Sequence, residues 1–343
     1  MPIAVMLVAS MTDGAWRELP SIPDKEGFAG SFAGVSGGAL IVAGGANFPD
    51  KKPHEGGSKV WHDRVLVLET SAGPWRTVQP LPRRLGYGVS VTHGGGVVCV
   101  GGSDELRHYS EAFRLTWSNG NLVTSDLPPL PTPFANGCGA LVGDWLYVMG
   151  GQETPQSTGA LRATWRINLG AENPRWERLA DLPGPGRIFA TAASVGGRFW
   201  VLGGAELFED SDGKQARRYL TDAYVFDPNG GWSRIADLPS PVTAAPSPAP
   251  TDEHGFYLLG GDDGTQVGVD ATKHRGFSKR ILRFDLKKGT WHDAGELPRP
   301  RVTVPCVVWN DCWVIPSGER RPGIRSPQVW TFEPASQQKA PQP

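Results

Sequence analysis

One pattern recurs six times along this chain of 343 residues. Each copy holds a Leu-Pro pair, a strand rich in small residues, an apolar strand that ends in Gly-Gly, and a further strand that a tryptophan usually follows. The Leu-Pro pairs begin at Leu19, Leu81, Leu130, Leu182, Leu238 and Leu297. The Gly-Gly pairs begin at Gly44, Gly101, Gly150, Gly203 and Gly260, and Ser317-Gly318 replaces the sixth. A repeat that fills the chain argues against a division into two unrelated domains.

A period near fifty with Gly-Gly after an apolar strand is typical of kelch repeats. We therefore predict an all-β, six-bladed β-propeller of the kelch type that forms a single domain over residues 1–343. The repeat units are roughly 16–75, 76–127, 128–176, 177–232, 233–291 and 292–335. Each unit supplies four strands, a to d from the axis outward. The continuous apolar b strands suit a sheet buried on both faces, and the c strands alternate more clearly.

The two ends of the chain predict how the ring closes. Residues 16–20 fit a d strand that has no a, b and c strands before it, and residues 328–332 fit a c strand that has no d strand after it. Pairing them completes the sixth blade with an N-terminal strand. Such closure leaves no long unpaired sheet edge.

Composition narrows the possible partners. The net charge is −1 with no block of like charges, which argues against nucleic-acid or membrane binding through bulk electrostatics. No segment approaches the ~20 apolar residues of a membrane span. The four cysteines and the scattered histidines have no metal-binding spacing, so buried free thiols and no metal are expected. The start of the chain lacks the basic region of a signal peptide, which favours the cytoplasm, although a misassigned start codon would leave the periplasm open.

Blade geometry predicts where a site would lie. Because successive strands reverse direction, the b–c turns and the d–a connections share one end of the molecule. The d–a connections carry Arg83, Arg84, Arg187, Arg299 and Arg301. The b–c turns carry Asn47, His54, Glu55, Asp104, Gln152, Glu206, Asp262 and Glu319. We therefore expect a polar, arginine-rich mouth at one end of the central channel.

The sixth unit departs from the others in this mouth. After Ser317-Gly318 come Glu319 and, across a tight Pro-Gly turn, Arg325. A carboxylate and a guanidinium so placed could act as an acid–base pair. On spacing alone, a plain ion pair that holds the loop explains them better.

A resemblance to a known protein family favours the acid–base interpretation of these two residues over a plain ion pair. The segment IPSGERRPGIRSPQVW, residues 315–330, resembles the active-site loop of the bacterial N-acetylneuraminate epimerases, which are six-bladed kelch propellers. Residues 27–48 and the HEGG at 54–57 resemble the most recognisable blade of that family, and residues 86–91, 130–141 and 182–193 match more loosely. The blades come in a different order here, which points to the cyclically permuted mutarotases. A shorter loop at 262–278 leaves the exact sugar open.

The resemblance implies a cofactor-independent mutarotase or epimerase acting on N-acetylneuraminate or a related keto sugar acid. In this interpretation Glu319 moves a proton, and Arg325 binds the carboxylate or supports a developing oxyanion. Candidate substrate contacts are Arg187, Asn47, His54, Glu55, Arg84 and Asn136. An ion pair lining the channel is an equally good role for Arg187, and ordering of the loop is a somewhat better one for Asn47, His54 and Glu55.

Two other functions remain open at this point. A non-catalytic kelch propeller could use the same mouth to bind a glycan or a protein. A copper radical oxidase would need two tyrosines, two histidines and a cross-linked cysteine, which the scattered tyrosines do not suggest. The sequence leaves the oligomeric state undetermined.

Overall fold

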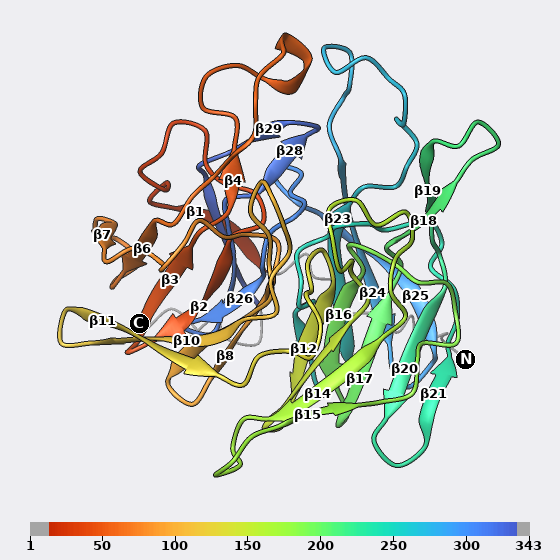
Figure 1. The fold of residues 1–343 in the computed structure, drawn as a ribbon, viewed down its shortest axis with the longest axis horizontal. Helices are drawn as coiled ribbons and strands as arrows, with labels where there is room; N and C mark the ends of the chain where they lie inside the picture. The colour runs from red at the N-terminus through yellow and green to blue at the C-terminus, as the bar shows by residue number, and fades with distance from the viewer. Residues whose placement is uncertain (1–13, 335–343) are drawn as a thin grey trace, which may run out of the picture.

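The computed structural model describes residues 14–334, which form six four-stranded antiparallel sheets arranged as blades around one axis (Figure 1). The predicted all-β, six-bladed propeller is confirmed. Within the described residues the one helix is the short 3₁₀ turn η2 (Pro53–Glu55). No helix there is long and apolar enough to cross a membrane.

Each blade runs from its innermost to its outermost strand in a regular order. The first blade holds β2 (Phe32–Ser36), β3 (Ala39–Ala43), β6 (Val65–Leu68) and β7 (Arg76–Val78), and the second holds β8 (Val89–His93), β9 (Gly96–Val100), β10 (Ala112–Ser118) and β11 (Asn121–Leu127). The third blade holds β12 (Cys138–Val142), β13 (Trp145–Met149), β14 (Thr164–Asn168) and β15 (Trp176–Arg178), and the fourth holds β16 (Thr191–Val195), β17 (Arg198–Leu202), β20 (Ala223–Asp227) and β21 (Gly231–Arg234). The fifth blade holds β22 (Thr251–Asp252), β23 (Gly255–Gly261), β24 (Ser278–Asp285) and β25 (Thr290–Glu296), and the sixth holds β26 (Val307–Trp309), β27 (Cys312–Pro316), β30 (Val329–Glu333) and β1 (Ala15–Leu19).

Three small hairpins extend from the turns between the second and third strands of their blades. They are β4 (Ala46–Asn47) with β5 (Val60–Trp61), β18 (Ala205–Glu209) with β19 (Gln215–Tyr219), and β28 (Glu319–Arg321) with β29 (Ile324–Arg325). All three lie at the upper end of the molecule in Figure 1.

The core lies between neighbouring blades. Strands β3 and β9 are buried at every position, as their apolar sequences predict. The alternation expected for the third strands is wrong for β6, which is buried throughout, and for most of β20. Flanking blades cover both faces of these strands, so neither face needs polar side chains.

The Gly-Gly pairs join one blade to the next. The Gly45 N–H donates to the carbonyl of Leu85 over 2.8 Å, and a Cβ at Gly44 would lie 2.1 Å from that oxygen. A side chain at Gly44 would therefore prevent this contact. In the sixth blade the Ser317 hydroxyl instead bonds to the backbone of Phe28, and the Gly318 N–H donates to the Phe28 carbonyl over 2.9 Å.

The blade tryptophans make a second connection of the same kind. Their indole N–H groups donate to backbone carbonyls at or next to the Leu-Pro marker of the same repeat unit, in the connection from the preceding blade. Examples are Trp75 to Pro20 (2.7 Å) and Trp232 to Ala180 (2.9 Å). An indole buried in this way packs its apolar ring while its N–H keeps a hydrogen bond, which explains why a tryptophan recurs at this position of the repeat.

The ring closes as predicted. Strand β1 pairs antiparallel with β30, and Trp16 lies opposite Phe332 with ring centres 5.0 Å apart. The sixth blade thus takes its outer strand from the other end of the chain.

Six residues around the axis are joined by a closed circle of backbone hydrogen bonds, which we call the axial ring. Each N–H donates to the carbonyl of the ring residue in the preceding blade, over 2.6–2.8 Å. The members are Gly30, Tyr87, Asn136, Phe189, Ala244 and Thr303, and all have φ between 53° and 67°. This backbone conformation is unfavourable for residues other than glycine, so the repeated hydrogen bonds hold it in place.

The axial ring predicts a stabilising substitution. Thr303 is β-branched and adopts φ 56°, whereas asparagine tolerates the left-handed region well. We expect Thr303→Asn to stabilise the protein by about 1 kcal/mol, measured as a higher melting temperature. Thr77→Asn is the control, because it places the same residue in the extended strand β7, where it should not stabilise. An unchanged or lower melting temperature for Thr303→Asn would contradict the prediction.

The cysteines give a second prediction. All four are free; Cys99, Cys138 and Cys306 are buried, and burial raises the pKa of Cys138 and of Cys306 to about 12. Because the thiolate is the reactive form, these thiols should resist labelling at pH 8. We expect the native protein to react with a thiol reagent mainly at the half-buried Cys312, and the denatured protein at all four. Rapid labelling of Cys138 in the native state would be the opposite result.

Candidate active site

The mouth of the propeller is built on the axial ring. The residue just after each Gly-Gly pair, or after its equivalent in the sixth blade, forms a β-bridge with the residue that directly precedes a ring member. The mouth positions are Ala46, Ser103, Gln152, Ala205, Asp262 and Glu319. Glu319 bridges Val302, so its backbone is one residue away from the ring member Thr303. The Glu319 backbone therefore lies next to the axial ring, at the mouth position of the sixth blade.

Glu319 and Arg325 are directly opposite each other in the β28–β29 hairpin. Arg325 Nη1 lies 3.3 Å from Glu319 Oε1, and the Gly323 N–H donates to the same oxygen over 2.6 Å. The Arg325 side chain is 5% exposed and that of Glu319 14% exposed. The predicted pair therefore exists, largely shielded from water.

Arg325 is held by groups that leave part of its guanidinium available. Its Nη2 lies 3.4 Å from the Tyr87 hydroxyl, and its plane lies 4.7 Å from the centre of the Phe48 ring. Its Nε and Nη1 make no hydrogen bond with the described residues. Nη1 is the nitrogen that faces the Glu319 carboxylate, so Nε is the one guanidinium nitrogen with no polar partner among residues 14–334. The planar donors of a guanidinium suit an oxyanion.

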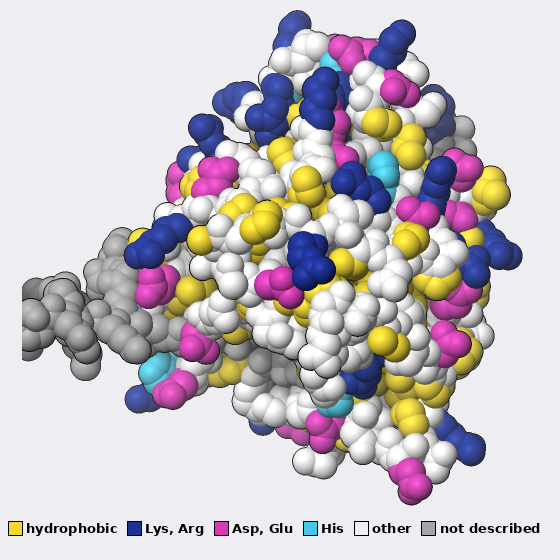
Figure 2. All heavy atoms as spheres, turned by 90° about the vertical axis from the view of Figure 1, so that its left-hand side faces the viewer, with side chains coloured by type: hydrophobic (Ala, Val, Ile, Leu, Met, Phe, Trp, Pro, Cys, Tyr) yellow, Lys and Arg dark blue, Asp and Glu magenta, His cyan; other side chains and the backbone are white. Residues whose placement is uncertain are grey.

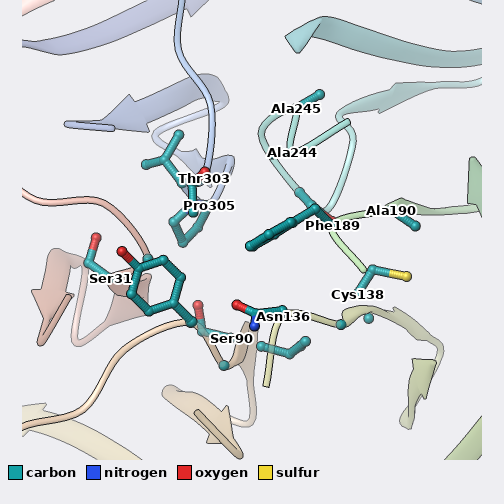
Figure 3. A pocket seen from close by; sticks show the side chains of 18 residues that line it. Ser31, Ser90, Asn136, Cys138, Phe189, Ala190, Ala244, Ala245, Thr303 and Pro305 are labelled. Carbon is teal, nitrogen blue, oxygen red and sulfur yellow. The ribbon is translucent and has the colours of Figure 1, made fainter. Parts of the chain in front are cut away.

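A small cavity lies on the axis at the level of the ring (Figure 3). Its volume is about 70 Å³, and Asn136, Phe189 and Thr303 contribute to its wall. That space accommodates a few water molecules and not a sugar acid. A substrate would therefore sit above the ring, in the mouth.

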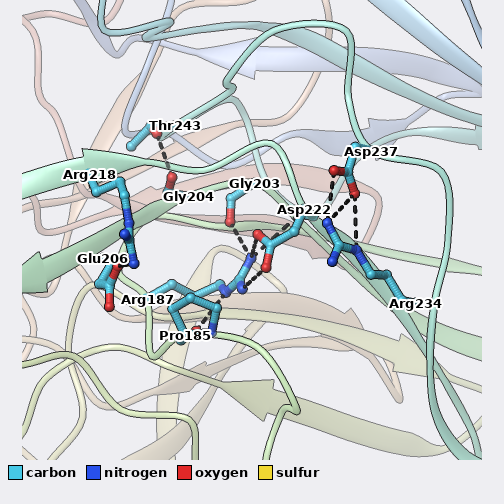
Figure 4. Close-up of polar contacts among 10 residues, drawn as sticks. All are labelled: Pro185, Arg187, Gly203, Gly204, Glu206, Arg218, Asp222, Arg234, Asp237 and Thr243. Atoms are coloured by element: carbon cyan, nitrogen blue, oxygen red, sulfur yellow. Dashed lines mark hydrogen bonds and ion pairs between the residues drawn. The ribbon is translucent and has the colours of Figure 1, made fainter.

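Arg187 lies away from the mouth. It is fully buried, and both of its terminal nitrogens bond to the carboxylate of Asp222 over 2.8 Å (Figure 4). Its remaining donors reach the carbonyls of Gly203 and Pro185. The geometry matches the ion-pair role that the sequence left open, and full burial shields the guanidinium from a substrate in the mouth.

Asn47 is also enclosed by protein. Its Nδ2 donates to the Gly27 carbonyl over 3.0 Å, and its Oδ1 lies 2.8 Å from His62 Nε2. Burial lowers the pKa of His62, and the charges of Arg64 and the exposed Arg84 act in the same direction. Asn47 thus orders the start of the β4–β5 loop.

His54 and Glu55 are exposed on η2. The Glu55 carboxylate accepts the Lys52 N–H over 2.8 Å, which caps the turn. A Cβ on Gly323 would lie 2.5 Å from Pro53, so η2 packs against the turn of the β28–β29 hairpin. This loop supports the candidate pair from outside.

Asn136 belongs to the axial ring and donates from Nδ2 to Gln152 Oε1 over 3.2 Å. The sequence analysis missed the other ring side chains, above all Tyr87 and Phe189. Their position in the repeat is the feature that could have identified them, because each follows its Leu-Pro pair by about the same number of residues. The residue type at this position differs from blade to blade.

The fifth blade adds a further group of titratable side chains. The Tyr219 hydroxyl donates to Asp262 over 2.9 Å, and burial, together with that carboxylate, raises the pKa of Tyr219 to about 12. His274 is buried, and burial lowers its pKa although the charges of Asp262 and Glu319 oppose the change. Sequence spacing gave no sign of His274. Over residues 14–334, no cluster of three or more His, Cys, Asp or Glu is arranged to hold a metal ion.

The buried Arg187–Asp222 pair predicts a large loss of stability when one partner is removed. Asp222→Asn would leave a buried guanidinium without its counter-ion, which destabilises a protein by about 3–5 kcal/mol. Thermal unfolding measures the change. Asp237→Asn is the control, because Asp237 pairs with Arg234 at the surface and its loss should have a much smaller effect (Figure 4). Equal effects of the two substitutions would contradict this interpretation.

The comparisons with known proteins all point to one protein family. The model of the N-acetylneuraminate epimerase family matches residues 6–124 and 127–268. N-acetylneuraminate epimerase of Haemophilus influenzae strain PittEE is 38% identical over 104 residues, which cover 26% of this chain and 27% of that protein. The enzyme of Salmonella enteritidis PT4 is 39% identical over 119 residues, covering 31% and 30%. The aligned segments thus span less than a third of these relatives, and the family match ends before Glu319.

Proposed function

The chain belongs to the N-acetylneuraminate epimerase family, and we propose that it is a mutarotase that interconverts the anomers of N-acetylneuraminate or a related keto sugar acid. The family predicted from the sequence is thereby confirmed. The activity, the small-molecule substrate and the roles of individual residues are our inference. The cytoplasmic location belongs to the same proposal and is compatible with four free cysteines.

The proposed reaction is a proton-transfer cycle. The anomeric hydroxyl loses its proton and the ring oxygen gains one, so the ring bond breaks and a ketone forms. Rotation of the opened carbon presents the other face of the ketone, and the reverse proton transfers close the ring as the other anomer. No redox step or group transfer is needed, so positioned acid–base groups and an anchor for the carboxylate suffice.

Glu319 is the proposed proton carrier. Its backbone lies next to the axial ring and its side chain is 14% exposed, while the Gly323 N–H and Arg325 orient the carboxylate. A carboxylate oriented by two donors can exchange a proton with a hydroxyl brought within hydrogen-bonding distance.

Arg325 is the proposed anchor of the substrate carboxylate. Its guanidinium has planar donors that suit an oxyanion, and its Nε has no partner among the described residues. Contacts with Tyr87 and Phe48 hold the guanidinium in place before substrate arrives. A pre-positioned donor stabilises developing charge without reorganising during the reaction. The observation that carries the proposal is this carboxylate–guanidinium pair at the axial mouth.

Replacing Glu319 tests the assignment. Glu319→Gln keeps the shape of the side chain but removes the acid–base group, so we expect the catalysed exchange of N-acetylneuraminate anomers to fall by about 10²- to 10³-fold. NMR saturation transfer between the anomeric signals measures the rate. Glu172→Gln is the matched control, because Glu172 is exposed in the turn between β14 and β15, away from the β28–β29 hairpin, and its loss should leave the rate near that of the unmodified protein.

Two results would contradict the proposal. Full exchange activity in Glu319→Gln would remove this residue from the mechanism. Saturable binding of the sugar acid by the unmodified protein without any acceleration of exchange would favour the alternative of a non-catalytic, glycan-binding propeller.

A further inference from the structure

A large polar pocket lies over the sixth blade, and Arg325 of the β28–β29 hairpin is part of its lining. Its volume is about 750 Å³, and we call it the sixth-blade pocket. Cationic side chains from three loops line it, among them Arg275, Arg299, Arg320 and Arg321. Among its described lining residues the one carboxylate is Glu26, which is paired with Lys52. Figure 2 shows Lys and Arg side chains gathered toward the end of the molecule that carries these loops.

Arg301 forms part of the wall of this pocket and is fully buried. Its guanidinium donates only to neutral groups: the Pro300 carbonyl (2.7 Å), the Ser326 hydroxyl (2.9 Å) and Gln328 Oε1 (3.1 Å). Its Nε has no hydrogen-bond partner among the described residues. Arg301 is therefore a buried cation without a directly bound counter-ion.

The fourth blade shows how a buried arginine at the same position of the repeat is neutralised. Arg187 and Arg301 both precede the residue that forms the β-bridge to the mouth, Ile188 in one blade and Val302 in the other. Their partners are also equivalent, because the carbonyls of Asp222 and Gln328 accept the N–H groups of Gly203 and Ser317, respectively. In the fourth blade the guanidinium meets a carboxylate, and in the sixth it meets the neutral amide of Gln328.

The electrostatics of the surroundings favour an anion at this point. Burial lowers the pKa of Arg301 to about 10, and the positive charges of Arg320 and Arg299 contribute in the same direction. The negative charge of Glu18 acts in the opposite direction and raises the pKa of Arg301. Glu18 lies next to Gln328, whose Nε2 is 3.4 Å from the Glu18 carboxylate. Arg301 still carries its charge at neutral pH. A buried guanidinium among like charges is stabilised most by an oxyanion that accepts its hydrogen bonds.

We propose that the sixth-blade pocket is an anion-binding site in which Arg301 receives a phosphate or carboxylate group of a small metabolite, with Arg325 on the wall between this site and the axial mouth. The proposal does not depend on mutarotation. It assigns to Arg301 a role that Arg187 cannot have, because Asp222 already occupies the equivalent position in the fourth blade.

Titration with inorganic phosphate and, separately, with acetate tests the site. The experiment uses the whole protein at constant ionic strength, with ³¹P and ¹³C NMR to follow the bound fraction. We expect saturable binding of at least one anion. Tighter binding of phosphate would identify a phosphoryl group, and tighter binding of acetate a carboxylate.

Two variants separate this site from general attraction to a basic surface. Gln328→Glu places a carboxylate next to Arg301, as Asp222 is placed next to Arg187, without enlarging the side chain. Arg301→Met removes the guanidinium. We expect each to weaken anion binding at least tenfold, while Arg217→Met, on the exposed β19 strand outside the pocket, leaves it unchanged. No saturable binding of either anion, or equal binding by Gln328→Glu and the unmodified protein, would overturn the proposal. Gln328→Glu retains Arg301, so the test holds even if Arg301→Met fails to fold.

Discussion

The axial ring is the constraint from which the arrangement of the mouth follows. Six backbone N–H groups donate around a closed circle, and each blade contributes one residue in a left-handed conformation. The residue before each member bridges the start of a b–c turn, so those turns are fixed at one distance from the axis. Glu319 lies where it does because its blade obeys the same rule as the other five.

The architecture could be predicted from sequence because each marker has one local physical cause. Gly44 is a glycine because the Leu85 carbonyl approaches too closely for a Cβ, and Gly45 because it adopts φ 92° and a Cβ there would lie 3.0 Å from the Ala29 carbonyl. The tryptophan recurs because its indole N–H bonds to a carbonyl in the connection from the preceding blade, as that of Trp75 does to Pro20. Such causes act within one repeat and its neighbour, so six copies of the pattern specify six blades and their closure by β1.

The site could be predicted only where its residues are neighbours in the chain. Glu319 and Arg325 face each other across a short hairpin, and their meeting follows from that turn. Arg187 and Arg301 show where prediction from the sequence fails. They occupy the same position in two repeats, yet their environments differ because residue 222 is an aspartate and residue 328 a glutamine, each on a different strand from its arginine. The ring side chains Tyr87 and Phe189 share a place but not a residue type, so no consensus marks them.

The pairing of β1 with β30 has a consequence for the candidate pair. The blade that carries Glu319 and Arg325 is also the blade whose outer strand is held only by non-covalent pairing of β1 with β30. Fraying of the N-terminal strand would loosen the sheet beneath the candidate pair before it reached the other five blades. The geometry of this pair should therefore report sensitively whether the circle of blades is intact.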